Sequence, residues 1–272
     1  MYYNLYDSHT HTDNSPDAHH SAMMLCESAV SRGISGIAIT DHCDMQDYDT
    51  DNYAMRIRQS YFETLKAKSV FGNSLSICSG IEMGQPLETP GKADAILDSY
   101  CFDFILCSLH ALTGQRDFYF NYYANHSAKQ LDIIFDAYLR LLIKTIRWGR
   151  FDSLAHMTYP LRYMINKDGE TVSLHRHMEL IDEALTLLIH NGKALEINAS
   201  GLRGTLGDTM PPLLIVKRYR ELGGELITLG SDAHSCCDVG AGLDVAMAHA
   251  SAAGFRYFAF YKERRPQMYK LL

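Results

Sequence analysis

Short apolar runs alternate along the chain with longer segments in which apolar residues recur every three to four positions. The short runs have the pattern of buried parallel strands, and the longer segments have the period of amphipathic helices. We predict strands at residues 4–7, 36–40, 75–81, 104–108, 153–155, 194–198 and 226–230. We predict helices at residues 21–32, 52–70, 128–148, 178–191, 210–222 and 239–253.

About seven strand-then-helix units follow one another, and this alternation is typical of an α/β fold with a parallel sheet. The pattern alone allows either a closed barrel or an open, doubly wound sheet. No internal repeat or Ser/Gly-rich linker divides the chain, so we expect a single domain over residues 1–272. The acidic, polar segment 44–52 is predicted to be a loop.

Composition narrows the class of protein. A hydrophobic fraction of 47% over 272 residues excludes a disordered chain. No apolar run reaches the roughly 18 residues of a membrane helix, and the N-terminal residues lack a signal-peptide pattern. The net charge of −7 argues against binding to long nucleic acids. We therefore expect a cytoplasmic protein that binds neither membranes nor long nucleic acids.

The seven cysteines are irregularly spaced and include no C-x-x-C pair. This pattern argues against a disulfide framework and against a thiolate zinc site. We expect free thiols buried in the core, in a reducing compartment.

The thirteen histidines are numerous for a chain of this size, and six of them lie where predicted strands end. These six are His9, His11, His42, His110, His156 and His234. The acidic residues Glu82 and Asp232 also lie at strand ends. The remaining histidines lie in predicted loops or helices, at His19, His20, His126, His175, His177, His190 and His249. Because the active site of a parallel β/α barrel lies at the C-terminal strand ends, we expect a barrel in which these side chains converge.

Spacing supports a metal site. His9 and His11 are two residues apart and project to one face of an extended strand, and Asp232 and His234 repeat the spacing. Converging imidazoles and carboxylates would be costly to desolvate without a cation. Imidazole and carboxylate ligands without thiolates suit zinc, manganese or iron. A catalytic ion takes about three protein ligands. The eight strand-end residues and Asp17 make nine, so we expect three divalent ions with Glu82 as a bridge.

The order of these motifs resembles that of the polymerase and histidinol phosphatase (PHP) superfamily. The matching motifs are His9-x-His11, Thr40-Asp41-His42, Gly80-x-Glu82, Ser108-x-His110, Ala155-His156 and Ser231-Asp232-Ala233-His234. The resemblance implies a distorted (β/α)7 barrel with a trinuclear metal site. Asp17 matches a further family ligand that is Asp or His, with His19 or His20 as the alternative at this position. Segments 117–119, 155–162 and 196–203 are most similar to histidinol-phosphatases of this family.

The resemblance implies hydrolysis of a small anionic phosphomonoester, L-histidinol phosphate, to L-histidinol and phosphate in histidine biosynthesis. A metal-bridging hydroxide would attack phosphorus in line, and we assign catalytic roles to Glu82, Asp232 and His234. We expect Arg162 and Arg203 to bind the phosphate, although either could instead form a surface salt bridge.

Two smaller assignments also stay open. Asp41 is expected to orient a metal-bound histidine, with a turn or helix cap as the alternative. Tyr119, Tyr122 and Tyr123 could stack on an imidazole, although packing explains such residues more simply.

Two other functions remain open at this point. One is a PHP phosphoesterase or exonuclease that acts on another phosphomonoester or on a nucleotide. The other is a non-catalytic metal-binding module, which all nine filled ligand positions disfavour. Three divalent ions would offset six of the excess negative charges, so the acidic balance is compatible with an anionic substrate. The oligomeric state is not predicted.

Overall fold

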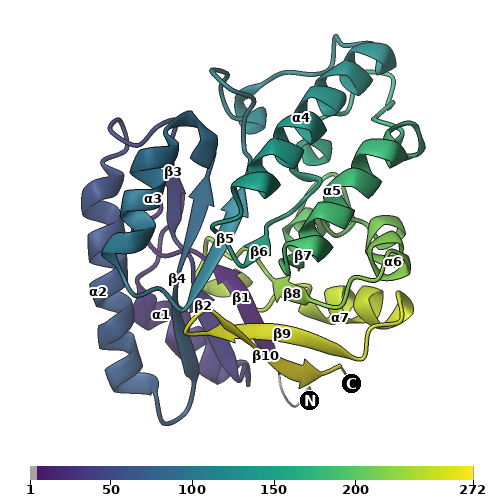
Figure 1. The fold of residues 1–272 in the computed structure, drawn as a ribbon. Coiled ribbons are helices and arrows are strands. Elements are labelled where there is room, and N and C mark those ends of the chain that lie inside the picture. The colour runs from purple at the N-terminus through teal and green to yellow at the C-terminus, as the bar shows by residue number, and fades with distance from the viewer. Residues whose placement is uncertain (1–4, 272) are drawn as a thin grey trace.

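A computed structural model of the chain describes residues 5–271 and shows seven parallel strands that form a nearly closed barrel (Figure 1). Their spatial order is β1-β2-β4-β5-β6-β7-β8. The strands are β1 (Tyr6–Thr10), β2 (Gly36–Ile39), β4 (Ser76–Gly84), β5 (Phe104–Ser108), β6 (Ser153–Leu154), β7 (Ala194–Asn198) and β8 (Ile227–Gly230). The α/β barrel expected from the strand-end chemistry is confirmed.

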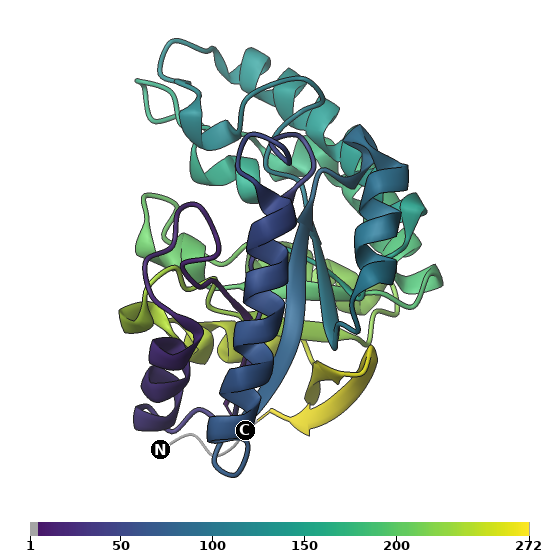
Figure 2. The ribbon, with the colours of Figure 1, turned by 90° about the vertical axis from the view of Figure 1, so that its left-hand side faces the viewer.

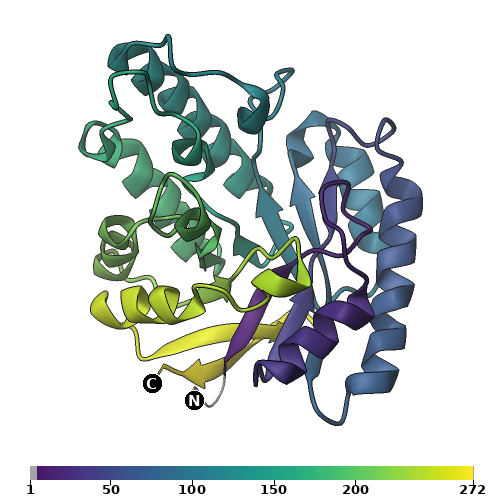
Figure 3. The same ribbon diagram turned by 180° about the vertical axis from the view of Figure 1, so that it is seen from behind.

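A helix follows each barrel strand, and the helices cover the outside of the sheet (Figures 2 and 3). The helices are α1 (Ala22–Ser31), α2 (Tyr53–Phe71), α3 (Pro90–Ser99), α4 (Ala128–Trp148), α5 (Met178–His190), α6 (Leu213–Glu221) and α7 (Leu243–Ala252). All seven barrel strands were predicted, whereas only six of these seven helices were, because no helix was predicted where α3 lies. Among the described residues, no helix combines the length and the apolar character needed to cross a membrane.

Local sequence signals explain where several helices begin and end. Ser127 and Gln130 form a capping box at the start of α4, and Gly149, with φ 73°, ends it. The prediction for this helix is therefore correct at both ends. Helix α6 begins three residues later than predicted because Pro211 and Pro212 lack the backbone N–H and disfavour helical conformation in the residue before them.

The second strand is interrupted, and this break positions part of the site. Strand β2 pairs with the first half of β4, whereas β3 (His42–Asp44) pairs with the second half. The register places His42 opposite Glu82. Strand β4 continues to Gly84, beyond the predicted end, so that Glu82 lies inside the strand. At the N-terminus, position 4 of the first predicted strand lies outside the described residues.

A C-terminal antiparallel hairpin that was not predicted packs against the N-terminal end of the barrel (Figure 1). It consists of β9 (Tyr257–Lys262) and β10 (Arg265–Lys270). Phe258 and Phe260 of β9 are buried, and the centroid of the Tyr6 ring in β1 lies 4.0 Å from that of Tyr269 in β10. The hairpin thereby extends the core below the barrel, away from the strand ends that carry the histidines.

The first and last barrel strands meet in a seam with few ladder bonds. His11 N donates to Ala233 O at 2.8 Å, and Asp232 N donates to His9 O at 2.8 Å. The buried carboxylate of Asp7 reinforces this seam, because it accepts from the backbone N–H groups of Ser231 at 2.9 Å and Gly240 at 2.8 Å. Burial raises the pKa of Asp7, and these donors oppose that shift. Asp7 therefore connects β1 to the segment after β8.

We expect Asp7→Ala to lower the free energy of unfolding by about 2–4 kcal/mol, because buried backbone donors would lose their acceptor. Urea-induced unfolding measures this change. Asp49→Ala is the matched control, since Asp49 is 88% exposed and its ion pair with Lys92 lies on the surface. An Asp7→Ala midpoint equal to that of the control would contradict this role for the seam.

Candidate metal centre

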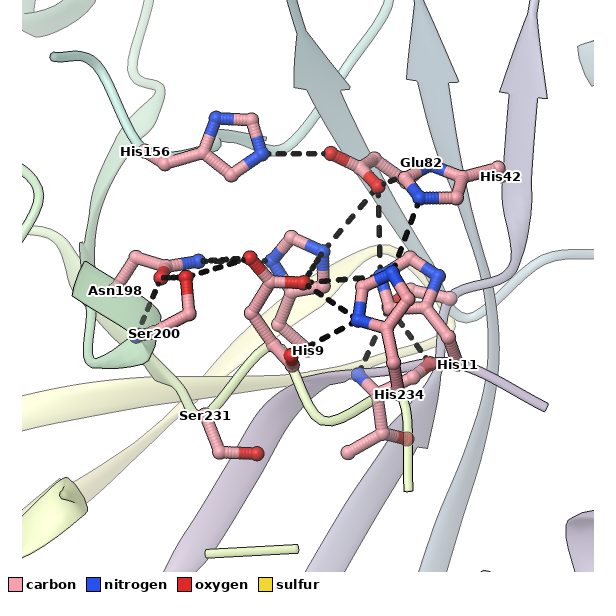
Figure 4. A network of polar contacts seen from close by, with 12 residues as sticks. His9, His11, His42, Glu82, His156, Asn198, Ser200, Ser231 and His234 are labelled. Carbon is pink, nitrogen blue, oxygen red and sulfur yellow. Dashed lines mark hydrogen bonds and ion pairs between the residues drawn. The ribbon is translucent and has the colours of Figure 1, made fainter. Parts of the chain in front are cut away.

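Glu82 occupies the centre of the predicted ligand set (Figure 4). Its carboxylate is fully buried in the barrel mouth. Oε2 lies 2.7 Å from His42 Nδ1, 3.4 Å from His9 Nε2 and 3.5 Å from His11 Nε2. One carboxylate oxygen thus faces three imidazoles, from β1, from the residue after its end and from β3.

The second oxygen of Glu82 faces a different pair of imidazoles. Oε1 lies 2.9 Å from His156 Nε2 and 3.2 Å from His110 Nε2. The Nε2 atoms of His110 and His156 are themselves 3.4 Å apart. Because its two oxygens point toward separate groups of ring nitrogens, Glu82 has the arrangement expected of a bridging carboxylate.

Two aspartates complete the cluster. Asp232 Oδ1 lies 3.3 Å from His11 Nε2 and 3.6 Å from His9 Nε2. Asp17, which is more exposed, has its carboxylate oxygens 3.2 Å from His234 Nε2 and 3.7 Å from His42 Nε2. All nine predicted ligands are therefore close together.

The neighbouring histidines considered for the position of Asp17 lie elsewhere. His19 is exposed, and His20 Nδ1 accepts a hydrogen bond from Cys236 N at 3.4 Å. The structure therefore places Asp17, and neither of these two imidazoles, beside His42 and His234.

The donor atoms fit a divalent-metal centre. Within residues 5–271, the buried atoms His9 Nε2, His11 Nε2, His42 Nδ1 and Glu82 Oε2 have no aligned hydrogen-bond partner. Buried polar atoms of this kind require a partner, and a cation would serve all four. Four groups of three residues also have ligand atoms within 4.8 Å of one another. These groups are His11-His42-His234, His9-His156-Asp232, His9-His11-Glu82 and His42-Glu82-His110.

Burial and the charges of neighbouring side chains shift the pKa values of the clustered carboxylates and imidazoles. Burial alone would raise the pKa of Glu82, but His42 and His9 hold it well below its usual range. Burial would also lower the pKa of His42, yet the Glu82 carboxylate raises it to about 10. For His11, burial and the neighbouring imidazoles lower the pKa. Protons balance the carboxylates when metal is absent, so metal binding would displace them.

Glu196 orients two of the histidines and was not identified from the sequence. Its Oε1 accepts from His9 Nδ1 at 2.7 Å, which directs His9 Nε2 toward Glu82. Its Oε2 accepts from the backbone N–H of His156 at 2.8 Å. A signal is present in the sequence, since Glu196 lies near the end of a predicted strand as Glu82 does, but that strand end carries no histidine to draw attention to it.

Other side chains fix the remaining rings. Asp44 Oδ1 lies 3.0 Å from His110 Nδ1, and Ser15 Oγ lies 3.0 Å from His11 Nδ1. Ser15 in turn donates to Asp41 Oδ1 at 2.8 Å. Asp41 also accepts from Thr12 N at 2.6 Å and from Thr12 Oγ1 at 2.7 Å, so it contacts the turn after β1 as well as the serine beside His11. The contacts of Asp44 and Ser15 with the rings select the ring nitrogen that is free to bind metal.

Backbone strain and close packing also occur in this cluster. His156 and Asp232 have positive φ values of 23° and 54°. This conformation is unfavourable for residues with a Cβ, so the surrounding contacts must hold it in place. Position 230 requires glycine because the side chains of Glu196 and His9 lie against its backbone. A Cβ at this position would lie 2.3 Å from Glu196 Oε1 and 2.5 Å from His9 Cβ.

A cleft of about 490 Å³ opens above the cluster and is lined by both predicted arginines. Arg162 Nη1 donates to Ser200 Oγ at 3.3 Å, and Arg203 Nη2 donates to Asp232 O at 2.9 Å. In the described part of the chain Arg162 forms no ion pair, whereas Arg203 has the Asp238 carboxylate at 3.9 Å. Both guanidinium groups therefore lie beside the candidate metal centre.

Of the three tyrosines considered for stacking, one lines this cleft. Tyr119 lines it, whereas Tyr123 is buried in the core and Tyr122 is 74% exposed.

The cysteines are also distributed differently from the expectation of core thiols. All seven are unpaired, but Cys101 and Cys237 are exposed and Cys236 is half-buried.

Replacing Glu82 by Gln is expected to reduce the number of divalent ions retained per chain, because the charge that balances five imidazoles is lost. Removing one partner of a buried ion pair costs about 3–5 kcal/mol. Elemental analysis after gel filtration measures the metal content, with Glu179→Gln on an exposed helix face as control. Full metal content in Glu82→Gln would exclude a central role for this carboxylate.

For Glu196→Gln we expect metal binding to weaken by about 10- to 100-fold, because the amide cannot accept from His9 and His156 at the same time. Competition with a chelator measures the affinity without an activity assay. Glu225→Gln, at a residue whose side chain is 82% exposed, provides the control. Unchanged affinity would show that Glu196 does not orient His9 for binding.

Comparison with known proteins agrees with this geometry. The family model described as "PHP domain" matches residues 7–200. The chain is 30% identical to a probable histidinol-phosphatase of Clostridium acetobutylicum, over 95% of this chain and 97% of that protein. It is 27% identical to a probable histidinol-phosphatase of Thermotoga maritima, over 94% and 95% of the two chains.

A solved structure has the same fold. It is histidinol phosphate phosphatase from Lactococcus lactis complexed with zinc, L-histidinol and phosphate. The TM-score is 0.78 at 23% identity, covering 97% of this chain and 99% of that one. The extent of the family match and the similarity to the Clostridium protein show that this chain belongs to the PHP family.

Proposed function

We propose that this protein is a metal-dependent phosphomonoester hydrolase that converts L-histidinol phosphate and water to L-histidinol and phosphate. The observation that carries the proposal is a buried carboxylate, Glu82, surrounded by imidazoles beneath a cleft that two arginines line. The names of the relatives and the ligands of the Lactococcus structure support the choice of substrate. We further propose that residues 1–272 act as one catalytic domain in the reducing cytoplasm, where its free thiols would persist.

The nine clustered side chains would hold three divalent ions. The two oxygens of Glu82 face different sets of imidazoles, which supports its assignment as a bridge. Zinc, manganese and iron all suit imidazole and carboxylate ligands, and zinc is present in the Lactococcus structure. Bound ions would supply Lewis acidity, which lowers the pKa of water toward ~7 and offsets the charge of the phosphoryl group.

The chain's own residues would bind and orient the phosphate. Arg162 and Arg203 line the cleft and can donate to phosphate oxygens in bidentate geometry. Asp232 and His234 also line the cleft, so they can contact both the substrate and the buried carboxylate cluster. We therefore assign catalytic roles to Asp232 and His234 together with Glu82, and phosphate binding to the two arginines.

Among phosphomonoesters offered to the metal-loaded enzyme, we expect L-histidinol phosphate to have the highest kcat/KM. Phosphate release across a panel of sugar, nucleotide and amino-alcohol phosphates measures this. A different ester with a kcat/KM about 100-fold higher would overturn the substrate assignment. Degradation of a single-stranded oligonucleotide at a comparable rate would instead favour a PHP exonuclease.

A further inference from the structure

Two adjacent cysteines, Cys236 and Cys237, follow closely after the metal ligands of the last barrel strand. They lie in a single turn of 3-10 helix that Ser235 caps and that ends at Asp238, here called the cysteine turn. Cys237 is exposed, Cys236 is half-buried, and both thiols are free. Of the other five cysteines, four are buried, and Cys101 is exposed but stands alone in the sequence. An oxidant in solvent therefore meets a pair of thiols only at the cysteine turn.

Hydrogen bonds hold the cysteine turn against helix α1 and the residues before it. Cys236 N donates to His20 Nδ1 at 3.4 Å, and Ser28 Oγ donates to Cys236 O at 2.5 Å. Arg32 Nη2 donates to Cys237 O at 2.8 Å. The backbone of the cysteine pair is thus fixed in one conformation while its thiols remain free.

The cysteine turn is connected directly to the candidate metal centre. His234 precedes it, and His234 Nε2 lies 3.2 Å from an Asp17 carboxylate oxygen. These two side chains are 29% and 61% exposed, more than any other predicted ligand. At the other end of the turn, the Asp238 carboxylate lies 3.9 Å from Arg203 Nε in the wall of the cleft. A change in the backbone of the turn would therefore act first on the exposed end of the cluster.

A disulfide between adjacent cysteines has unusual geometry. Neighbouring Cα atoms lie about 3.8 Å apart across a trans peptide, whereas disulfides usually join Cα atoms about 4.4–6.8 Å apart. Such a bond is strained, and strained, exposed disulfides are readily reduced. The peptide group between Cys236 and Cys237 must also reorient to close the ring. Its carbonyl accepts from Ser28 Oγ, and its N–H donates to Ser235 Oγ at 3.3 Å, so ring closure competes with both contacts.

We propose that Cys236 and Cys237 form a redox-modification site, at which a peroxide converts the two thiols into a vicinal disulfide that a small thiol can reduce again. The more exposed sulfur, that of Cys237, attacks hydrogen peroxide; the O–O bond breaks, and a sulfenic acid and water form. The Cys236 sulfur then attacks the sulfenic sulfur, the S–O bond breaks, and the oxygen leaves as water. The two thiols lose two electrons and two protons, and one peroxide becomes two water molecules.

The expected consequence is weaker retention of metal. Reorientation of the turn would displace the backbone of His234, so a metal ion held by His234 and Asp17 would dissociate more easily. This consequence rests on the proposed metal centre, whereas the oxidation itself does not. Disulfides of proteins in a reducing compartment are usually transient and redox-sensing, which agrees with a strained and reversible bond.

The test uses the zinc-loaded protein, because zinc has no redox chemistry of its own. The protein is treated with hydrogen peroxide, its remaining thiols are alkylated, and its peptides are analysed by mass spectrometry. We expect the peptide that contains Cys236 and Cys237 to lose two hydrogen atoms and to escape alkylation. Transfer of zinc to a chromogenic chelator should become about 10-fold faster after oxidation. Dithiothreitol should reverse both changes.

Three variants separate the cysteine pair from other oxidation products. Cys237→Ser should form no disulfide and should release zinc at the same rate before and after peroxide. Cys236→Ser should stop at the sulfenic acid of Cys237, which dimedone traps. Cys101→Ser, which removes the exposed thiol outside the pair, should behave as the wild type does.

Full alkylation of both thiols after peroxide, or a disulfide that joins two chains, would overturn the modification site. A disulfide between Cys236 and Cys237 with unchanged zinc release would overturn its connection to the metal centre. Both results leave the phosphatase assignment intact, because neither measurement uses the substrate. Failure of the untreated wild type to retain zinc, manganese or iron would overturn the proposed function together with the expected effect on metal retention.

Discussion

The compensation of one buried negative charge governs the architecture of this protein. An ionised carboxylate that is fully buried, as Glu82 is, is costly unless cationic or hydrogen-bonding partners surround it. No single strand can supply enough partners, because its side chains alternate between two faces. The chain meets this need by bringing imidazoles from β1, β3 and the ends of β5 and β6 to one point. The barrel is the arrangement in which these strand ends meet.

Much of this arrangement could be predicted from the sequence because parallel strands impose a rule on position. Once apolar runs are recognised as strands, a histidine or carboxylate at each C-terminal end must lie near the barrel axis. That rule identified eight of the nine clustered side chains; Asp17 was added as a ninth ligand, and the family resemblance then supported its place. It could not identify the β9–β10 hairpin, whose place beneath the barrel depends on packing against Tyr6 at the opposite end of the chain. Helix α3 was also missed, although Pro90 at its first position is a helix-start signal.

The contacts that orient the site were harder to predict for a related reason. Glu196 and His9 are 187 positions apart, and only the closed barrel brings the carboxylate to the correct ring nitrogen. Ser15 and Asp44 likewise orient the rings of His11 and His110. The spacing of residues along the chain does not specify how a ring is oriented. Asp17, His19 and His20 are close in sequence, and only the path of the loop separates their positions.

The seam between β1 and β8 has a consequence for biosynthesis. Asp7 and Ser231, which it joins, are separated by 224 positions. During translation the N-terminal histidines are synthesised long before the last barrel strand. Contacts between residues so far apart in the sequence form slowly. The side chains of His9 in β1 and of His11 after it can therefore contact Asp232 and His234 only after most of the chain has been translated. The cluster is accordingly complete only once strand β8 and the residues after it have been made, and metal held by all nine side chains would bind no earlier.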